Sequence, residues 1–471
     1  MPISTKFNKV PYAIAGDSFI SSAKDLSSQY TRNMLAIPAP NSLTDSAALY
    51  SFPGQKAWST GVAGEVDRGI YKQKFDGKGW KVSGSTLYSF DSAGTQTSQG
   101  AIGAGGLVSM ADNGNVLFIV AGTTAYTHDG TTLSTLSLSF IPVMVDYLND
   151  QFICLSSASL IYVSDVGTTT FDPINSITAN SASDLMVGIS VFNQFLFNFK
   201  GNNIEPWENT GAGNPPFERM NGAIIENVGL ANKNAIASTS EAIYFLGADK
   251  LPYRIVNFQA QKLSDNNPGI SELFKGYDKD NAFVECFEIF GQDIILFYFV
   301  IDKIVWATSQ ETGLWFKVDS DVNATFYKGK TIARLFDKDL IGDRENGNIY
   351  ELDAATYQNN GTAMARERVF RPMAGETVGA PRAYLQMRLI QFAVETGVGD
   401  TDYMMVSIST NGGRSFGSER WLTLGEVGDY LETVETYDNR KFKDMTVKIR
   451  YTGNTRFTLY DAAIYVRECG K

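Results

Sequence analysis

Short apolar runs recur along the middle of the chain, each followed by a tight polar turn and a second apolar run that ends near an aromatic residue. Runs of this kind, rich in Ile, Val, Phe and Tyr and bounded by Gly and Asn, are typical of β-hairpins. The hairpins begin roughly 35 to 55 residues apart, near the spacing of about 40 to 50 residues between propeller blades. The six clear hairpins begin at Val116, Gln151, Gln194, Ala242, Asp293 and Leu340, and Gly69–Tyr71 with Thr86–Phe90 forms a weaker seventh. We therefore predict that residues 66–355 form a β-propeller of six or seven blades.

Beyond residue 360 the apolar runs become longer and partly alternate with polar residues. Alternation over seven or more residues, with polar turns between the runs, is typical of half-buried antiparallel strands in a sandwich. The strands that carry this pattern begin at Ala383, Tyr403, Met445 and Phe457. We predict a separate β-sandwich-like domain over residues 360–471 and an all-β protein as a whole.

The first 55 residues lack a regular pattern. Ser, Ala, Asn and Pro are frequent there, and Pro38–Asn41 interrupts any regular element. Such a segment cannot bury enough surface to order itself, so residues 1–55 are predicted to be an extended arm that folds on a partner. Its candidate anchors are Phe7, Tyr12, Phe19, Ile20, Tyr30, Met34 and Leu35. The alternative is that the segment packs along its own ring or braces the C-terminal domain, because termini are commonly tied down within their own domain.

Two insertions within the predicted propeller are rich in turn residues. They cover residues 209–222 and 263–276 and contain Asn-Pro-Pro and Asn-Pro-Gly sequences, so we expect them to be loops rather than strands. Loops on the rim of a ring are common sites of partner binding. The candidate contact residues in these loops are Asn209, Phe217, Arg219, Leu273 and Phe274.

Composition agrees with a turn-rich β protein. Only 19% of the 471 residues are charged, below the roughly 25% of average globular domains, whereas 43 residues are glycine. The longest apolar run, Ile294–Ile301, is about half the length that a membrane helix needs. The N-terminus has no apolar segment of the kind found in signal peptides. We expect neither membrane insertion nor secretion.

The chain is acidic, with a formal charge of −11 and a pI near 4.8. Tight nucleic-acid binding relies on Lys and Arg that neutralise phosphates, so this charge argues against it. The same sign suits a surface along which DNA passes without sticking. Charge alone is compatible with both a protein that ignores DNA and one that repels it.

No group of residues indicates a metal, a cofactor or catalysis. Metal ligands usually cluster at short spacing, whereas Cys154, Cys286, Cys469 and the single His128 are far apart in sequence. The glycines of Gly100–Gly106 complete no phosphate-binding motif. One histidine in a turn offers no serine-protease triad. We expect no catalytic, cofactor-binding or metal-binding residues.

Ser409–Phe416 has the spacing of an Asp-box, the turn found in sialidase-like propellers, with Asn411 in place of the aspartate. The turn has a structural explanation, since Asn411 can bond to nearby backbone, Gly412 and Gly413 can take positive φ, and Phe416 can plug the sheet. A glycosidase also needs two carboxyl groups about 5 to 9.5 Å apart, and no such pair stands out. A carbohydrate-active propeller acting on host surface glycans remains the alternative function.

Three stretches resemble the tail hub proteins of short-tailed bacteriophages, also called packaged DNA stabilisation proteins. Each stretch is weak by itself, but their order and spacing together are persuasive. They are residues 31–54 followed by Asp67–Tyr71, Asn203–Gly211 followed by Pro216–Ala223, and Ile341–Asp353 followed by Tyr357–Gly361.

The resemblance implies a non-enzymatic virion component made in the host cytoplasm. Proteins of this family are expected to combine a β-propeller with accessory β domains. Six copies form a nozzle below the portal and adaptor, retain packaged DNA, surround the DNA exit channel and carry tail fibres, spikes or needles. Double-stranded DNA then passes without sequence-specific binding. A third possibility is a scaffold propeller of cellular origin, which would be monomeric.

Overall fold

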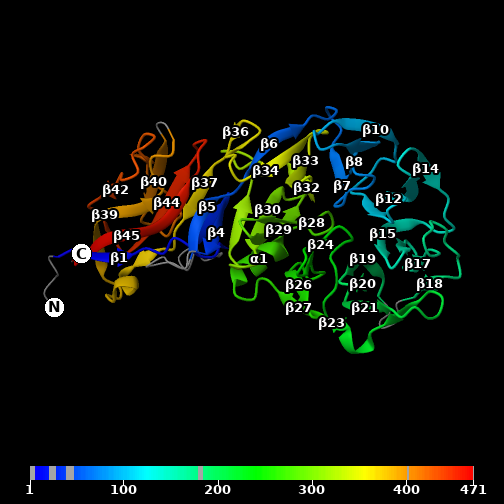
Figure 1. Cartoon of the computed structure of the whole chain (residues 1–471). Helices are drawn as coiled ribbons and strands as arrows, with labels where there is room; N and C mark the ends of the chain where they lie inside the picture. The colour runs from blue at the N-terminus through cyan, green and yellow to red at the C-terminus, as the bar shows by residue number, and fades with distance from the viewer. Residues whose placement is uncertain (1–5, 21–27, 39–46, 179–183, 400–401, 470–471) are drawn as a thin grey trace.

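A computed structural model of the chain contains two β-rich bodies placed end to end, a ring of small sheets and a sandwich (Figure 1). The structure describes residues 6–20, 28–38, 47–178, 184–399 and 402–469. The first and last described strands, β1 (Asn8–Pro11) and β45 (Thr458–Cys469), pair with each other in the sandwich. Within the described residues α1 (Pro268–Gly276) is the single α-helix, which confirms the all-β prediction.

The ring is a β-propeller whose blades are antiparallel sheets of four strands, each beginning with the strand nearest the axis. Long inner hairpins follow the predicted apolar runs: all residues of β12, β16 and β25 are buried. In blade order the first four sheets are β7 (Asp67–Ile70), β8 (Gly79–Ser83), β9 (Thr86–Phe90), β10 (Gln96–Ala101); β11 (Ser109–Asp112), β12 (Leu117–Ala121), β13 (Thr124–His128), β14 (Leu133–Leu136); β15 (Pro142–Leu148), β16 (Gln151–Ser156), β17 (Ile161–Val163), β18 (Ser176–Ile177); and β19 (Met186–Phe192), β20 (Phe195–Lys200), β21 (Asn203–Asn209), β22 (Phe217–Arg219), with β23 (Ile225–Glu226) beside β21.

Three more sheets complete the ring, so the described residues form seven blades, within the predicted range of six or seven. The weaker hairpin that begins at Gly69 is the first of them. The last three sheets are β24 (Ile236–Ser238), β25 (Ile243–Leu246), β26 (Pro252–Val256), β27 (Gln259–Lys262); β28 (Phe283–Ile289), β29 (Gln292–Phe299), β30 (Ile304–Ser309), β31 (Trp315–Val318); and β32 (Gly329–Leu335), β33 (Lys338–Asp343), β34 (Ile349–Asp353), β6 (Gly54–Ser59), to which β35 (Gln358–Asn359) and β36 (Thr362–Ala363) add.

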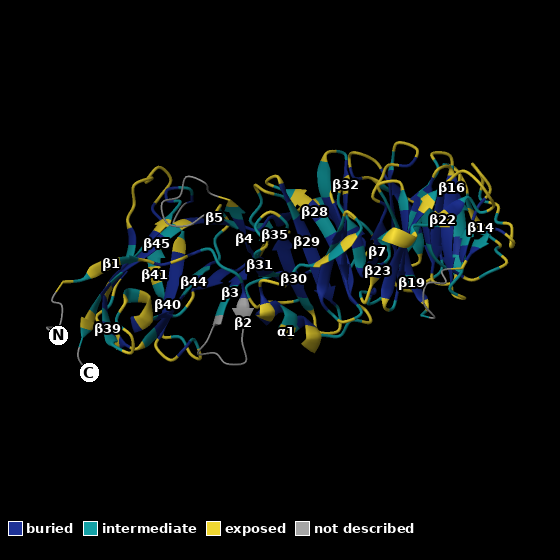
Figure 2. Ribbon diagram, turned by 90° about the horizontal axis from the view of Figure 1, so that it is seen from below, coloured by how far each residue is buried: buried dark blue, intermediate teal, exposed yellow. Residues whose placement is uncertain are grey.

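Apolar side chains hold neighbouring blades together. Trp80 of the first blade and Ile119 of the second share one buried cluster, and the rings of Phe118 and Phe152 join the second blade to the third at a centroid distance of 5.3 Å. Figure 2 shows the resulting buried strands in the interior and exposed turns around the rims. Burial of such side chains is the main favourable contribution to folding.

A strand from the N-terminal segment closes the ring. β6 is the fourth strand of the last blade and pairs antiparallel with β34, beside which it lies in Figure 1. A buried carboxylate strengthens the closure, since Thr331 Oγ1 on β32 donates to Asp67 Oδ2 on β7 at 2.6 Å. The propeller therefore includes residues before 66, the predicted start, because its last blade takes a strand from the other end of the sequence.

The sandwich consists of two sheets that enclose one apolar core. The first sheet has the order β4-β5-β45-β39-β42, with β1 beside β45 and β43 beside β39. The second has the order β3-β37-β44-β40-β41, with β2 beside β3 and β38 beside β44. The strands not yet given are β2 (Phe19–Ile20), β3 (Ser28–Arg32), β4 (Met34–Pro38), β5 (Ala47–Ser51), β37 (Arg366–Val369), β38 (Met373–Ala374), β39 (Tyr384–Val394), β40 (Tyr403–Ser409), β41 (Arg420–Thr423), β42 (Val434–Tyr437), β43 (Lys441–Phe442) and β44 (Asp444–Tyr451).

Here the structure differs from the predicted division of the chain. The described parts of residues 1–55 are not an arm outside the domains, because they supply strands to the sandwich and β6 to the propeller. Residues 360–471 accordingly do not make the sandwich alone. The N-terminal strands have two to six residues, and their partners lie far away in sequence, so no local periodicity marks them. The alternative in which this segment braces the C-terminal domain describes the observed arrangement.

The N-terminal segment also links the two bodies. β3 pairs with β31 of the sixth blade at Arg32 and Lys317, so that one sheet continues from the blade into the sandwich. The Arg32 guanidinium lies buried against the Asp319 carboxylate, with Nη2 and Oδ1 2.9 Å apart. Asn33 Nδ2 donates to the same oxygen at 2.9 Å. A charged, hydrogen-bonded cluster thus fixes the joint.

The two predicted rim loops contain regular elements that their turn-rich composition concealed. Residues 209–222 include β22, the outer strand of the fourth blade, and the start of the 3₁₀ turn η1 (Asn221–Ala223). Residues 263–276 include α1, whose cap Asn267 accepts a hydrogen bond from the Ile270 N–H at 3.1 Å. Pro268 at the first helical position needs no hydrogen bond for its nitrogen, so Asn-Pro is a helix start here. A second 3₁₀ turn, η2 (Gly375–Val378), lies in the sandwich.

Candidate functional site

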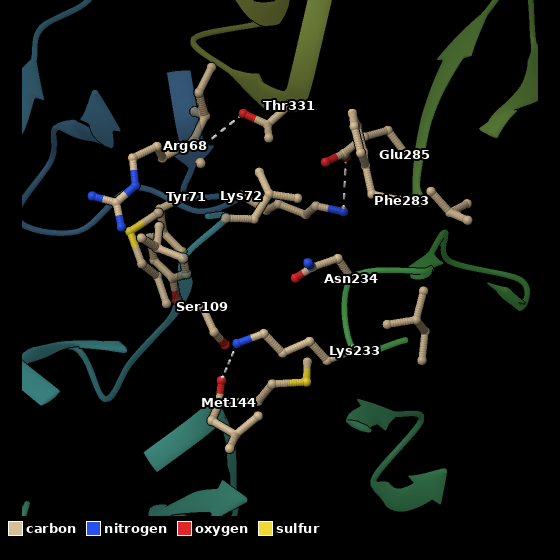
Figure 3. Close-up of a pocket in the computed structure, with 18 residues that line it drawn as sticks. Arg68, Tyr71, Lys72, Ser109, Met144, Lys233, Asn234, Phe283, Glu285 and Thr331 are labelled. Atoms are coloured by element: carbon tan, nitrogen blue, oxygen red, sulfur yellow. Dashed lines mark hydrogen bonds and ion pairs between the residues drawn. The ribbon is translucent and has the colours of Figure 1, made fainter. Parts of the chain in front are cut away.

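A polar cavity of about 260 Å³ lies between the innermost strands of the propeller, and Figure 3 shows the residues that line it. Its walls come from the innermost strands β7, β11, β15, β24, β28 and β32, or from residues next to them. Each of these strands begins a different blade. The ring therefore brings together residues that are far apart in the sequence.

One side of the cavity carries an ion pair. Lys72, just after β7, extends toward Glu285 on β28, with Nζ and Oε2 3.7 Å apart. Burial raises the pKa of Glu285 to about 7, although the nearby Lys72 ammonium opposes the shift. Desolvation lowers the pKa of Lys72, whose side chain stays half exposed, but attraction to Glu285 and Cys286 together outweighs this effect, so the pKa of Lys72 is raised overall.

The opposite side carries a second lysine and an amide. Lys233 Nζ donates to the Val143 carbonyl at 3.1 Å, and burial lowers the pKa of this lysine. Asn234 lies between Lys72 and Lys233 in Figure 3. The lining of the cavity thus contains two lysines, one amide and one carboxylate close to the axis.

Arg68 adds a third positive charge behind the wall. Its guanidinium donates to the carbonyls of Gly84, Gly103 and Gly106 at 2.6 to 2.8 Å. These bonds anchor the β8–β9 turn and the loop from the first blade to the second. Two nitrogens, Nε and Nη1, make these three bonds, whereas Nη2 is buried and has no hydrogen-bond partner among the described residues, so Arg68 brings both charge and one unused donor group to the cavity.

The cavity offers little for hydrolysis. Of the residues that line it, all within the described part of the chain, Glu285 is the single carboxylate, whereas acid–base cleavage of a glycosidic bond uses two. The hydroxyl of Ser109 is engaged with the Val145 backbone, donating to its carbonyl at 2.9 Å and accepting from its N–H at 3.1 Å. The arrangement suits binding of a small polar group better than catalysis.

Three of the six candidate docking residues of the N-terminal segment lie inside the chain's own core. Met34 and Leu35 are completely buried, and Tyr12 is buried against Phe370, with ring centroids 4.9 Å apart. The Tyr12 hydroxyl donates to the Arg371 carbonyl at 2.9 Å. These side chains stabilise the sandwich and its joint in the structure and leave no surface there for a partner.

The other three lie nearer the surface or outside the description. Phe7 is half-buried beneath the Arg467 guanidinium, 4.6 Å from its ring centroid. The hydroxyl of half-buried Tyr30 donates to the Glu367 carboxylate. Phe19 belongs to β2, and its side chain lies outside the described residues, as does that of Ile20.

The rim candidates divide in the same way. Phe217 is buried between blades, and Phe274 of α1 is buried against the propeller. Asn209, Arg219 and Leu273 are half-buried. Most residues between β21 and β22 are exposed. Of the predicted contact sites, the rim is therefore the one that a partner can reach.

Sequence reasoning missed Lys72, Lys233, Asn234 and Glu285. They lie in ordinary inner strands or just beside them and form no motif, and only closure of the ring brings them to one cavity. Their position in or beside the first strand of the first, fifth and sixth blades is the one signal that could have indicated them.

The turn at Ser409–Phe416 has the predicted backbone. Gly412 and Gly413 take φ of 69° and 74°, and Asn411 Oδ1 accepts from the Ser415 N–H at 3.1 Å. The turn lies at the end of β40 in the sandwich, away from the propeller cavity. Phe416 differs from the prediction, since it is half-buried with Lys448 Nζ 4.9 Å from its ring centroid and does not plug the core.

Replacing Asn411 with Ala is expected to cost about 1 kcal/mol of the free energy of unfolding, because a turn side chain that satisfies backbone N–H groups is lost. Urea unfolding measures this change. The exposed neighbour Arg414→Ala is the control, expected within about 0.5 kcal/mol of the parent. A loss above about 3 kcal/mol for Asn411→Ala would show that the turn has a larger role than the structure assigns.

The histidine and cysteines occupy structural positions. His128 is buried against Trp80, with ring centroids 4.5 Å apart, and its Nδ1 accepts from the Gly130 N–H at 3.0 Å. Cys154 is buried in the third blade, and burial alone raises the pKa of its thiol. Within the described residues no three His, Cys, Asp or Glu side chains form a group that could hold a metal ion. None of the described helices has the length and apolar character needed to span a bilayer.

Solved structures similar to the chain share little sequence with it. The WD40 β-propeller domain of Doa1 is 14% identical, with 63% of this chain and 97% of that chain covered and a TM-score of 0.41. YCF48 bound to D1 peptide is 13% identical, with 64% and 98% covered and a TM-score of 0.41. The computationally designed Ika8 protein is 8% identical, with 63% and 100% covered and a TM-score of 0.40. A comparison with curated proteins gives no match.

Family comparisons match both bodies of the fold. The family described as bacteriophage P22 Gp10, beta-propeller, matches residues 9–357, and the one described as bacteriophage P22 Gp10, beta-sandwich, matches residues 373–467. These family descriptions are those of a structural protein of a bacteriophage. The chain belongs to the bacteriophage P22 Gp10 family, the tail hub or packaged DNA stabilisation proteins. The predicted resemblance and the predicted combination of propeller and sandwich are confirmed. The propeller match begins at residue 9 and so includes most of the N-terminal segment.

Proposed function

We propose that the protein is the tail hub of a short-tailed phage, placed below the portal and adaptor, where it retains packaged DNA and carries tail fibres, spikes or needles. The observation that carries this proposal is the family match over both domains. The continuous sheet from the sixth blade through β3 into the sandwich supports it, since a part under load from packaged DNA needs a rigid joint. The protein then resides in the virion after synthesis in the host cytoplasm.

We infer that DNA passes between copies of the protein rather than through one propeller. The axial cavity has about 260 Å³, and a sphere of that volume is about 8 Å across, narrower than the major groove of B-DNA alone at about 12 Å. A ring of copies is therefore required to surround a duplex, and six copies fit the family. The acidic charge of −11 favours a wall that DNA does not adhere to.

Contacts with partner proteins are then made by residues other than the buried side chains of the N-terminal segment. The exposed part of the rim between β21 and β22 is one candidate, with Asn209 and Arg219 at its base. Leu273 on α1 and the half-buried Phe7 are others. We propose these surfaces for contacts with the adaptor, with fibres or with neighbouring copies.

We also propose that the protein is not an enzyme. The single carboxylate in the axial cavity and the structural turn at Ser409–Phe416 support this view. An assay against sialosides and host surface polysaccharide tests it. Specific turnover that one Asp or Glu substitution abolishes would instead favour the carbohydrate-active alternative.

Electron microscopy of the full chain mixed with portal and adaptor rings tests the assembly. We expect a six-fold ring on the channel axis below the adaptor, because closed rings are formed by heterologous contacts whose rotation closes. The chain without the adaptor is expected to be monomeric or weakly associated. A monomer that never joins the portal–adaptor complex would contradict the hub assignment and favour a free scaffold propeller.

A further inference from the structure

We propose that the axial cavity of the propeller is a binding site for a small oxyanion, a group of the sulfate, phosphate or carboxylate kind. The residues that would hold it are Lys72, Lys233 and Asn234, with Glu285 as the opposing charge. A tail hub needs no such ligand for its structural role, so this site goes beyond the proposed function. The charge of the cavity, its unused hydrogen-bond donors and its size support this site.

The charge of the cavity is opposite to that of the chain. Its lining contains three cationic side chains, Arg68, Lys72 and Lys233, and one carboxylate, Glu285. The whole chain has a formal charge of −11. A concave site with low-dielectric walls concentrates ions of the opposite sign, so an excess of positive charge here attracts anions that the outer surface repels.

The lysines retain donors that the protein does not use. An ammonium group has three N–H donors, and Lys233 directs one of them to the Val143 carbonyl. Lys72 Nζ and Glu285 Oε2 are 3.7 Å apart, longer than a hydrogen bond of about 2.7 to 3.2 Å. Glu285 Oε2 is buried and accepts no hydrogen bond. An anion in the cavity therefore competes with Glu285 for the Lys72 ammonium.

The position of Asn234 adds a neutral donor between the two ammonium groups (Figure 3). An amide NH₂ supplies two N–H donors to an oxyanion. The remaining wall is partly apolar, with Phe283, Ile236 and Met144 among its residues. A partly apolar wall lowers the local dielectric constant and strengthens charge-assisted hydrogen bonds.

Size restricts the ligand to a small one. The cavity of about 260 Å³ lies below the range of about 300 to 1,000 Å³ typical of sites for drug-sized ligands. Inorganic sulfate or phosphate and short organic acids fit this volume, whereas a nucleic acid strand does not. These ligands share the oxyanion chemistry, and the experiment distinguishes inorganic from organic sources.

The test is isothermal titration calorimetry of the full chain with sodium sulfate and, separately, with sodium succinate in chloride buffer at pH 7.5. We expect one site per chain. Lys233→Met should weaken binding about tenfold, because one charge-assisted hydrogen bond is lost. Lys9→Met is the matched control, since Lys9 is exposed on β1 outside the cavity, and its affinity should equal that of the parent.

Substitution of Glu285 should change the anion affinity in the opposite direction. Glu285→Gln removes the negative charge from the cavity and frees Lys72, so anion affinity should rise several-fold. Glu288→Gln is the control, because Glu288 lies exposed on the same strand outside the cavity and should leave affinity unchanged. An opposite response of the two cavity variants is not expected from general loss of fold, which circular dichroism and thermal melting of each variant monitor.

Tighter binding of sulfate than succinate identifies an inorganic oxyanion, and the reverse order identifies an organic acid; either result supports the site. Absence of saturable binding by both ligands overturns the proposal. So does binding that Lys233→Met and Glu285→Gln leave unchanged. None of these outcomes bears on the six-fold ring, which electron microscopy tests independently.

Discussion

Deletion of residues 2–15 is expected to unfold the sandwich. The deletion removes β1 and the side chains of Tyr12 and Ile14, which are 4% and 0% exposed in the sandwich core. Loss of one large buried side chain costs about 2 to 5 kcal/mol, and two of them together approach the whole stability of a typical domain, about 5 to 15 kcal/mol. Thermal melting followed by circular dichroism should show a lower first transition or none for the sandwich.

Point substitutions distinguish the loss of buried side chains from the shortening of the chain. Tyr12→Ala and Ile14→Ala should each lose about 2 to 5 kcal/mol, whereas Lys9→Ala on the exposed side of β1 should change stability by less than about 0.5 kcal/mol. Full thermal stability of the deleted chain, combined with failure to join the portal–adaptor complex, would refute the structural role and restore the segment as a connector to partners. Loss of stability with assembly retained would identify the segment as an internal brace.

Substitution of Asp319 is expected to be the most damaging single change at the joint. Asp319→Ala leaves the Arg32 guanidinium without its carboxylate in a buried position, where side-chain exposures are 9% for Arg32 and 2% for Asp319. Breaking a buried ion pair by removal of one partner costs about 3 to 5 kcal/mol. Asn33 also loses a hydrogen-bond acceptor, which increases the cost. Urea unfolding of the full chain measures the loss.

Two further variants test whether the loss of stability comes from the buried ion pair. Glu345→Ala removes an exposed ion pair with Lys328, whose atoms are 3.1 Å apart, and should cost at most about 1 kcal/mol. The double variant Arg32→Met with Asp319→Asn removes both charges of the pair and should lose less than Asp319→Ala alone. Equal losses for Asp319→Ala and Glu345→Ala would show that the buried pair does not hold the joint.

The role of the N-terminal segment changes where partners are expected to bind. Because Tyr12, Met34 and Leu35 are committed to the core, docking by these residues would require the sandwich to open. Contacts with other proteins are more readily made by the rims of the propeller and by exposed parts of the sandwich. There Trp421 and Tyr430 are 64% and 71% exposed on and just beyond β41.

The propeller hairpins were predictable because each is local. Two adjacent apolar runs and a turn of Gly, Asn or Asp specify a hairpin within about 15 residues, and the repeat of that pattern specifies a ring. The turn before Phe195 illustrates this, since Asn193 and Gln194 take positive φ of 46° and 69° there. The long strands β39, β40 and β44 were predictable from their length and alternation.

The short elements were not predictable in the same way. Pro268 in a turn-rich stretch starts a helix because Asn267 caps it, and Asn267 also donates to the Ser18 carbonyl at 2.9 Å across the fold. The three-residue strand β22 exists because β21 offers it a free edge. The Ser18 contact of Asn267 is distant in sequence, and β22 is too short to show an apolar period, so composition alone indicates a loop in both places.

The sequence by itself determined the all-β class, the repeated hairpins, the change to longer strands after residue 360 and the phage tail hub family, because each of these depends on local patterns or on short motifs in order. Only the tertiary structure decided that the ring closes with β6, that the N-terminal strands complete the sandwich, and that Lys72, Lys233, Asn234 and Glu285 share one cavity. The physical reason is that strand pairing and ring closure join residues distant along the chain, and their stabilisation comes from burial and hydrogen bonds that exist only after the chain has folded.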